Sequence, residues 1–308
     1  MQGQHGLSIL NSRVLADADK LREAFTRGEP FPHIAIDDFL APEYAQQLLS
    51  QFPGFEQGNF KAEDGSAGGK STLDKVRSLG PAYRQLDDAI KSPEFLQALS
   101  RITGIDDLIY DPWYLGGGTH ESRNGVSLDP HVDFNYHPSE RWHRRLNVII
   151  YLNPDWEAQW GGCFELFRDP HASPRPDRTI SPVFNRCAIF ATSEHSWHGF
   201  DAIQLPEAHA DRTRRSIALY FYTKDRPQEE VADPHTVFYV KRQLPEHFAE
   251  GHVLSAEDAA LARDLIAQRD GHIRLLYAEN TALRKAQDAG LMGNLLYFAK
   301  RAFVRYRR

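Results

Sequence analysis

The chain has 308 residues, of which 41% are hydrophobic and 25% charged, and its formal net charge is −6. This length allows one large domain or two ordinary ones, and the negative charge gives no reason to expect a nucleic-acid partner. Two cysteines, Cys163 and Cys187, are too few for a disulfide framework and indicate a reducing compartment. We expect a cytoplasmic protein, because the first residues lack the features of a signal peptide and no run of about 18 apolar residues occurs.

Residues 1–108 are predicted to form a helical or mixed N-terminal region that packs on a core. Apolar residues recur at intervals of three and four in segments 12–25, 41–52 and 92–102, which is typical of amphipathic helices. Ser92 is the expected N-cap of the last of these helices, since Pro93 suits the first helical position.

Residues 109–226 are predicted to form a β-sandwich or barrel. Short runs such as "RLNVIIYLN", "RCAIFAT" and "RSIALYFYT" are rich in β-branched and aromatic residues and are separated by turn-forming residues. No segment long enough for a crossover helix lies between them, which argues against a parallel sheet. The overall expectation is a mostly β protein with flanking helices.

Residues 227–308 are predicted to form a helical C-terminal extension, with Ser255 as the N-cap of its main helix. An imperfect apolar seam along this helix favours a homodimer; it consists of Leu261, Leu265, Ile273, Leu276 and Leu283. The end of the chain, residues 291–308, is basic and aromatic. Such a segment can lie on the inner face of an anionic membrane as a peripheral contact, or it can pack as a helix on the domain or on a partner, or fray.

The stretch "GSAGGKST" superficially resembles a phosphate-binding loop. Counting back from Gly69 and Lys70, the first glycine that this loop requires falls on Asp64, and the preceding segment is not a buried strand. We therefore do not expect a nucleotide site here.

The stretch "LDPHVDFNYHP" places His131 and Asp133 two residues apart, so on an extended strand both side chains point to one face. Alone, this pair is more often a solvated loop feature. Downstream, His198 follows a strand-like run, and Arg214 and Ser216 again lie two apart. Two histidines and a carboxylate make a facial triad suited to Fe(II), and zinc prefers more nitrogen or sulfur ligands. An arginine near such a triad can hold the far carboxylate of a keto acid.

These pieces resemble the iron(II)- and 2-oxoglutarate-dependent dioxygenases, specifically their prolyl-4-hydroxylase-like branch, over about 110–225. The matching pieces, in the family's order, are "HVD" at 131–133, "YLNPDW" at 151–156, "GGCFELF" at 161–167, "WHG" at 197–199 and "RRSIALYFY" at 214–222. The resemblance implies a double-stranded β-helix, or jelly-roll, core at 109–226.

The resemblance also implies a role for each matching residue. His131, Asp133 and His198 would be the catalytic iron ligands, and the pocket for 2-oxoglutarate would be formed by Arg214, Tyr151, Ser216 and Asn147. Arg214 would pair with the distal carboxylate of 2-oxoglutarate, and the Tyr151 hydroxyl would hydrogen-bond it. Asn147 is included because it precedes Tyr151 by four residues on the same strand face.

Several neighbouring residues compete for these roles. His195 competes with His198, which we prefer because Trp197 and Gly199 flank it as in the family motif. Arg212 and Arg215 compete with Arg214, because the segment from His198 to Arg214 is longer than is usual in the family. Alternation along the strand would turn Arg215 to the opposite face.

The implied activity is that of a 2-oxoglutarate-dependent hydroxylase that uses Fe(II), 2-oxoglutarate and O₂, with ascorbate as a candidate reductant, and releases succinate and CO₂. Halogenating relatives lack the carboxylate at the position of Asp133, so we predict hydroxylation over halogenation. The substrate could be a peptidyl proline or an amino acid, another small molecule, or a sugar or lipid-linked glycan. The alternative is a non-catalytic jelly-roll module that binds metal or carbohydrate and carries a C-terminal oligomerisation helix.

Overall fold

The computed structural model describes residues 7–61, 67–245, 247–288 and 299. The chain divides into two compact units, residues 1–240 and 241–308, and each is described by itself. The domain boundaries expected near residues 108 and 226 remain predictions.

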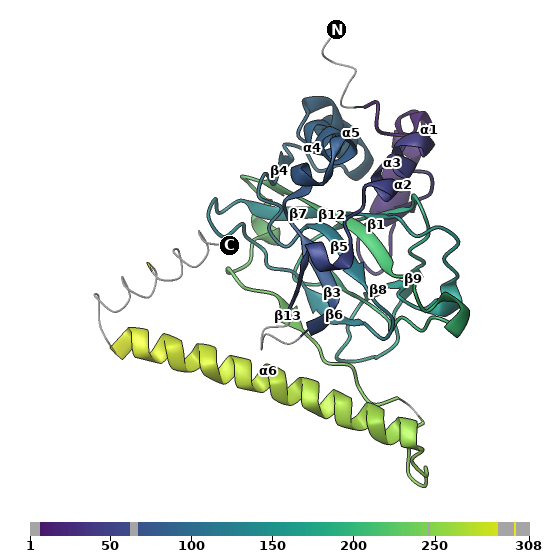
Figure 1. The fold of residues 1–308 in the computed structure, drawn as a ribbon. Helices are drawn as coiled ribbons and strands as arrows, with labels where there is room; N and C mark the ends of the chain where they lie inside the picture. The colour runs from purple at the N-terminus through teal and green to yellow at the C-terminus, as the bar shows by residue number, and fades with distance from the viewer. Residues whose placement is uncertain (1–6, 62–66, 246, 289–298, 300–308) are drawn as a thin grey trace. The chain divides into compact units, whose positions relative to one another are not determined.

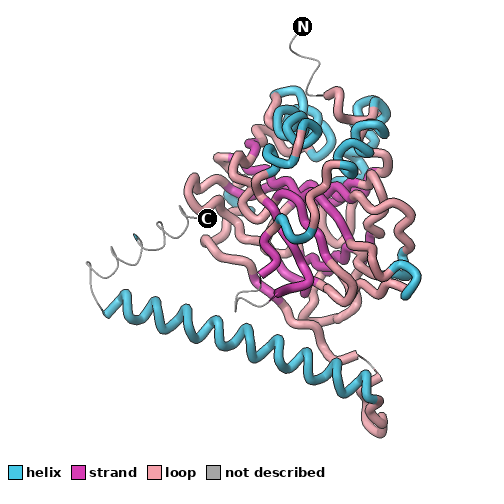
Figure 2. Tube along the Cα trace, viewed as in Figure 1, coloured by secondary structure: helices cyan, strands magenta, loops and turns pink. Residues whose placement is uncertain are grey.

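The first unit is built on two antiparallel sheets (Figures 1 and 2). The larger sheet has the strand order β1-β10-β7-β12-β5-β3-β2, with β4 also paired to β12, and the smaller has the order β13-β6-β11-β8-β9. The larger sheet comprises β1 (His33–Ile36), β2 (Asn59–Lys61), β3 (Ala67–Leu73), β4 (Ile109–Tyr110), β5 (Gly118–Ser122), β7 (His143–Tyr151), β10 (Cys187–Ala191) and β12 (Arg214–Thr223). The smaller comprises β6 (Leu128–Val132), β8 (Phe164–Phe167), β9 (Arg178–Ile180), β11 (Trp197–Phe200) and β13 (Phe238–Tyr239). This arrangement confirms the predicted mostly β fold with a jelly-roll core.

Strand β12 shows how alternation along a strand separates the core from the interior cavity. Ile217, Leu219 and Phe221 are buried in the hydrophobic core that the larger sheet shares with the N-terminal helices. The opposite face of the strand lines a cavity, with Arg214, Ser216, Ala218 and Tyr220. Because successive side chains of a strand point to opposite faces, the sequence "RRSIALYFYT" supplies both surfaces at once.

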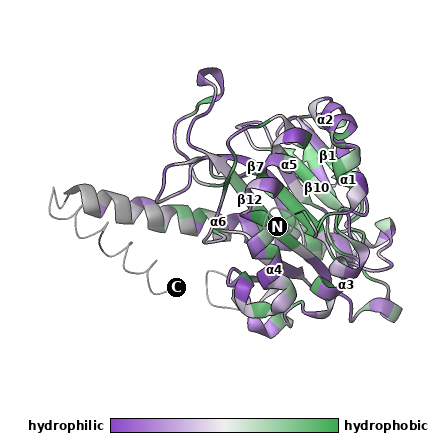
Figure 3. Cartoon of the chain, turned by 90° about the horizontal axis from the view of Figure 1, so that it is seen from above, coloured by the Kyte–Doolittle hydropathy of each residue, from purple (hydrophilic) through white to green (hydrophobic). Residues whose placement is uncertain are grey.

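Five helices precede the jelly roll and cover one face of the larger sheet (Figure 1). They are α1 (Ser12–Ala16), α2 (Ala18–Thr26), α3 (Pro42–Ser50), α4 (Pro81–Ile90) and α5 (Pro93–Thr103). The Ser92 side chain accepts a hydrogen bond from the Phe95 amide, so the predicted N-cap is confirmed. Phe95 of α5 stacks on Phe221 of β12, with ring centroids 6.3 Å apart. Figure 3 shows the hydrophobic residues gathered on the central strands near these helices.

Short 3-10 turns complete the first unit. They are η1 (Phe55–Gln57), η2 (Val76–Leu79), η3 (Ala158–Trp160), η4 (Glu207–His209) and η5 (Gln228–Glu230).

The second unit contains the long helix α6 (Ala256–Asp288). Ser255 caps it as predicted: the Ser255 hydroxyl accepts from the Asp258 amide, and the Asp258 carboxylate accepts from the Ser255 amide, both at 3.0 Å. Leu261, Ile273 and Leu276 of the predicted seam are exposed. The homodimer remains a prediction, and the membrane contact expected of residues 291–308 falls, apart from residue 299, outside the described residues. No helix within the described ranges is both long and apolar enough to span a bilayer.

Candidate active site

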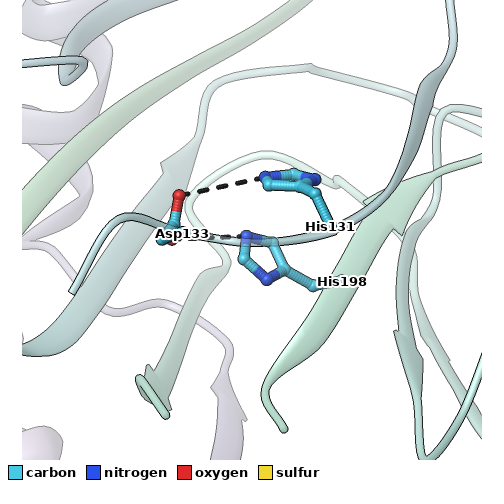
Figure 4. Close-up of side chains that lie close together, drawn as sticks. All are labelled: His131, Asp133 and His198. Carbon is cyan, nitrogen blue, oxygen red and sulfur yellow. Dashed lines mark ion pairs between the residues drawn. The ribbon is translucent and has the colours of Figure 1, made fainter. Parts of the chain in front are cut away.

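Two histidines and an aspartate meet where β6 pairs with β11. His131 on β6 lies directly opposite His198 on β11, and their ring centroids are 4.2 Å apart. Asp133 follows β6 and turns its carboxylate toward both rings (Figure 4). Its Oδ1 lies 3.9 Å from His131 Nε2, and its Oδ2 lies 3.6 Å from His198 Nε2. The three side chains can therefore each offer one atom to a single ion.

Backbone hydrogen bonds hold both imidazoles with Nε2 turned toward the carboxylate. His131 Nδ1 lies 3.0 Å from the Asp129 carbonyl, and His198 Nδ1 lies 2.8 Å from the Ser196 carbonyl. A carbonyl accepts only from a protonated Nδ1, so in the neutral ring Nε2 carries the free lone pair that a metal requires. Burial lowers the pKa of His131 to about 3, which keeps this ring neutral.

Asp133 is kept ionised inside the protein by its neighbours. Burial opposes ionisation, but the charge of Arg144 and the hydrogen bond from Asn147 contribute to lowering the pKa of Asp133 to about 2. Arg144 Nη2 lies 3.0 Å from Asp133 Oδ2, and Asn147 Nδ2 donates to the same oxygen at 2.7 Å. Arg144 Nε donates in turn to Asn147 Oδ1 at 3.0 Å. The donor set, two neutral imidazoles and one carboxylate, fits Fe(II).

Asn147 therefore lies at the metal end of the site. In the structure its side chain binds Asp133 and Arg144, and its role in a 2-oxoglutarate pocket remains a prediction. The period-two argument placed Asn147 on the correct face of β7, but a shared face does not determine which end of the cavity a side chain reaches.

A cavity of about 230 Å³ connects the triad with the inward face of β12. Arg214 is buried in its wall, and Ser216 lies two residues further on. Arg214 Nε donates to the Gly162 carbonyl at 2.6 Å, and its guanidinium lies 4.3 Å from the Phe200 ring centroid. No carboxylate of the described residues forms an ion pair with Arg214. A buried guanidinium without a carboxylate partner favours the binding of an anionic ligand.

Gly162 makes this position of Arg214 sterically feasible. It has a φ of +67°, and a Cβ at this residue would lie 2.9 Å from Arg214 Cδ. A side chain would be strained here by the backbone and would also displace the arginine. The Gly-Gly turn before β8 thus has a physical role beside Arg214.

The structure separates the competing residues. Arg215 faces the other side of β12 and pairs with Glu121 at 3.1 Å, and Arg212 donates to the Pro154 carbonyl. His195 is exposed, whereas His198 is buried beside His131. Of these residues, only Arg214 and His198 line the cavity.

Tyr151, at the end of β7, is fully buried and lies opposite Ser216 of β12. Its ring centroid is 5.1 Å from the Arg214 guanidinium carbon. The hydroxyl forms no well-aligned hydrogen bond among the described residues, and the Arg214 guanidinium beside it is its polar neighbour. Burial raises the pKa of Tyr151 to about 12, so the phenol stays protonated and can donate a hydrogen bond.

Sequence reasoning missed several residues of the site. Arg144 is one; Lys70, His120, Tyr220 and Tyr239 also line the cavity. Tyr239 of β13 stacks on His131, with centroids 5.1 Å apart. Tyr220 lies within the quoted piece "RRSIALYFY" but was given no role, and the others lie outside the quoted family pieces, because strand pairing between segments far apart in the sequence brings them to the site.

Residues 118–222 match the family model of the 2OG-Fe(II) oxygenase superfamily. This segment contains His131, Asp133, His198 and Arg214, the residues that the structure gathers around one cavity. The part of the chain that carries the site is therefore similar to the 2OG-Fe(II) oxygenase superfamily.

Similar proteins include several prolyl hydroxylases. Prolyl 3-hydroxylase OGFOD1 of Mus musculus is 29% identical over 113 residues, which are 32% of this chain and 20% of that protein. The match thus spans about a fifth of that curated relative's length. Solved structures include a Trichoplax adhaerens prolyl hydroxylase in complex with a hypoxia-inducible-factor peptide (TM-score 0.48, 17% identity, 69% of this chain and 93% of that chain). A Phytophthora capsici prolyl 4-hydroxylase has a TM-score of 0.46 at 17% identity and covers 95% of this chain and 92% of that chain.

Proposed function

We propose that this protein is an Fe(II)- and 2-oxoglutarate-dependent dioxygenase that hydroxylates an unactivated carbon of its substrate. The observation that carries the proposal is a single cavity holding two neutral histidines, an ionised aspartate and a buried arginine without a carboxylate partner. His131, Asp133 and His198 would hold the metal. Arg214, Ser216 and Tyr151 would hold the distal carboxylate of 2-oxoglutarate.

When bound, Fe(II) supplies the oxidative chemistry, in which one oxygen atom of O₂ enters the substrate as a hydroxyl group and the other enters succinate, with release of CO₂. The residues of the chain bind and orient. Arg214 and Tyr151, whose ring centroid lies 5.1 Å from the guanidinium carbon, would supply a charge-assisted and a neutral hydrogen bond to the distal carboxylate and so orient the keto acid. Ile149, Phe164 and Phe200 line the remaining wall with apolar groups that limit access of water.

The substrate class that we propose to test first is a prolyl residue in a peptide. The sequence match to a prolyl 3-hydroxylase supports this choice. A free amino acid and a sugar or lipid-linked glycan are the other substrate classes to compare in the same succinate-release assay.

The proposal is tested by anaerobic titration with Fe(II) and 2-oxoglutarate, monitored by the weak visible charge-transfer band of the chelated complex. We expect the band in the wild type and its loss in His198→Ala, because the variant lacks one of three metal ligands. His195→Ala is the matched control and should retain the band, since His195 is exposed. A folded, metal-loaded wild type without the band would contradict the proposal and support a non-catalytic binding module.

A second prediction concerns the carboxylate site. Arg214→Met should weaken 2-oxoglutarate binding about 100-fold, because a paired set of charge-assisted hydrogen bonds is lost. Arg215→Met removes the same charge one residue away, where the side chain pairs with Glu121 on the other face. It should change the affinity less than about twofold, since a partly exposed ion pair contributes little. Equal effects of the two variants would show that Arg214 is not the carboxylate ligand.

A further inference from the structure

A second cationic side chain, Lys70 of β3, faces the cavity. Strand β5 lies between β3 and β12, the strand that carries Arg214. Arg214 of β12 lies opposite Ser122 of β5, and Ser122 lies opposite Lys70 of β3. All three side chains line the cavity. Neighbouring strands are about 4.8 Å apart, so the backbones of Lys70 and Arg214 are roughly 10 Å apart. Two long side chains at this distance can reach one small anion between them.

Two residues further along the same strands, His120 adds an imidazole. His120 of β5 lies opposite Ser216 of β12, and its ring also lines the cavity. Its Nε2 is buried and has no hydrogen-bond partner among the described residues. Burial, followed by the charges of Lys70 and Arg214, lowers the pKa of His120 to about 3, so the ring is neutral. We call Lys70, His120, Ser122 and Arg214 the basic wall.

The two cations of the basic wall form no direct ion pair with a carboxylate of the described residues; Asp133 attracts Lys70, and Asp201 attracts Arg214, only at longer range. Within that part of the chain, the Lys70 amine takes part in no hydrogen bond or ion pair, and Arg214 pairs with no carboxylate. Asp133, which lines the same cavity, is already bound by Arg144 and Asn147. Bringing Lys70 and Arg214 to one cavity without a directly paired carboxylate is unfavourable unless a ligand brings negative charge.

We infer that Lys70 is a second cationic ligand of the distal carboxylate of the 2-oxo acid, acting together with Arg214 across Ser122. This inference rests on the proposed function and adds to it a selectivity: the site would favour 2-oxo acids with a second carboxylate over those with one. The small size of the cavity supports a shared anion, because both cations face the same space of about 230 Å³.

The pKa of Lys70 gives a further measurable consequence. Burial, and then the charge of Arg214, lowers this pKa to about 8. The amine is therefore charged below about pH 8 and loses its charge as the pH rises above that value. Affinity for the dicarboxylate should fall between pH 7 and pH 9 in the wild type, and this fall should be absent when Lys70 is replaced.

The experiment compares two ligands on anaerobic, Fe(II)-loaded protein by the charge-transfer titration. 2-Oxoglutarate has a distal carboxylate, whereas 2-oxobutyrate has the same chelating end without it. Lys70→Met should weaken 2-oxoglutarate binding about tenfold, the effect of losing one charge-assisted hydrogen bond. It should leave 2-oxobutyrate binding within about twofold. Lys70→Arg should retain most of the 2-oxoglutarate affinity, and Lys75→Met, which removes an exposed lysine just after β3, should have no effect.

Comparing the two ligands also distinguishes failure of the inference about Lys70 from failure of the proposed function. Unchanged 2-oxoglutarate affinity in Lys70→Met would overturn the inference and leave the proposed function intact. Equal weakening of both ligands would also overturn it, because Lys70 would then act on the chelating end or on the fold. Absence of the band in the wild type at every concentration of 2-oxoglutarate would reject the proposed function itself.

Discussion

Asparagine in place of Asp133 is expected to abolish 2-oxoglutarate turnover and to lower the free energy of unfolding of the metal-free protein by about 3 kcal/mol. The loss of turnover follows because Asp133 is the one carboxylate of the triad. The loss of stability has a different cause. Arg144 is 1% exposed and its guanidinium lies 3.0 Å from the Asp133 carboxylate, so the substitution leaves a buried cation without its counter-ion. Chemical denaturation in the presence of a chelator measures this second effect.

A double substitution separates the two effects of Asp133. Asp133→Asn combined with Arg144→Met removes both charges, and replacing a whole buried pair is far less costly than breaking it. We expect the double variant to recover most of the lost stability while turnover stays absent, with a coupling free energy above about 1 kcal/mol in the thermodynamic cycle. If the stability losses of the two single variants simply add up in the double variant, the contribution of Arg144 to stability does not depend on Asp133.

Gly199→Ala is expected to weaken Fe(II) binding about 10- to 100-fold by separating the two histidines, a loss comparable to that of a group that orients a metal ligand. Gly199 follows His198 on β11, and a Cβ at this position would lie 2.5 Å from the Leu128 carbonyl oxygen on β6. Backbone atoms cannot rotate away as a side chain can, so the two strands must move apart. Overpacking of this kind costs about 1–3 kcal/mol. The displacement occurs beside His198, which lies directly opposite His131.

Metal affinity and thermal unfolding should be measured for Gly199→Ala beside Gly54→Ala, since a Cβ at Gly54 would meet no atom within 4 Å. The control should match the wild type in both measurements. If Gly199→Ala binds Fe(II) as the wild type does, the spacing of β6 and β11 does not determine the geometry of the triad. The prediction thus offers a steric explanation for the glycine in "WHG", Gly199.

Local patterns predicted the short strands of the β core, and the family resemblance added the jelly roll and the candidate metal ligands. His131 and Asp133 were found because residues two apart share a strand face, and the same argument selected Arg214 over Arg215. The caps at Ser92 and Ser255 were predicted correctly because a capping hydrogen bond joins residues only three apart in the sequence. The hydrogen bond from Asn147 to Asp133 was not predicted, since their distance depends on how β7 and β6 face each other.

The sequence by itself indicated a mostly β core, because strand patterns depend on residues that are neighbours in the chain, and the family resemblance supplied the candidate site residues. The tertiary structure alone decided that Arg144 binds Asp133, that Tyr239 covers His131, and that Lys70 faces the same cavity as Arg214. Lys70 lies in the stretch that resembles a phosphate-binding loop, but residues 67–73 form strand β3. Its register with β5 brings it to the cavity, and pairing between segments about 50 residues apart leaves no periodic signal in either segment.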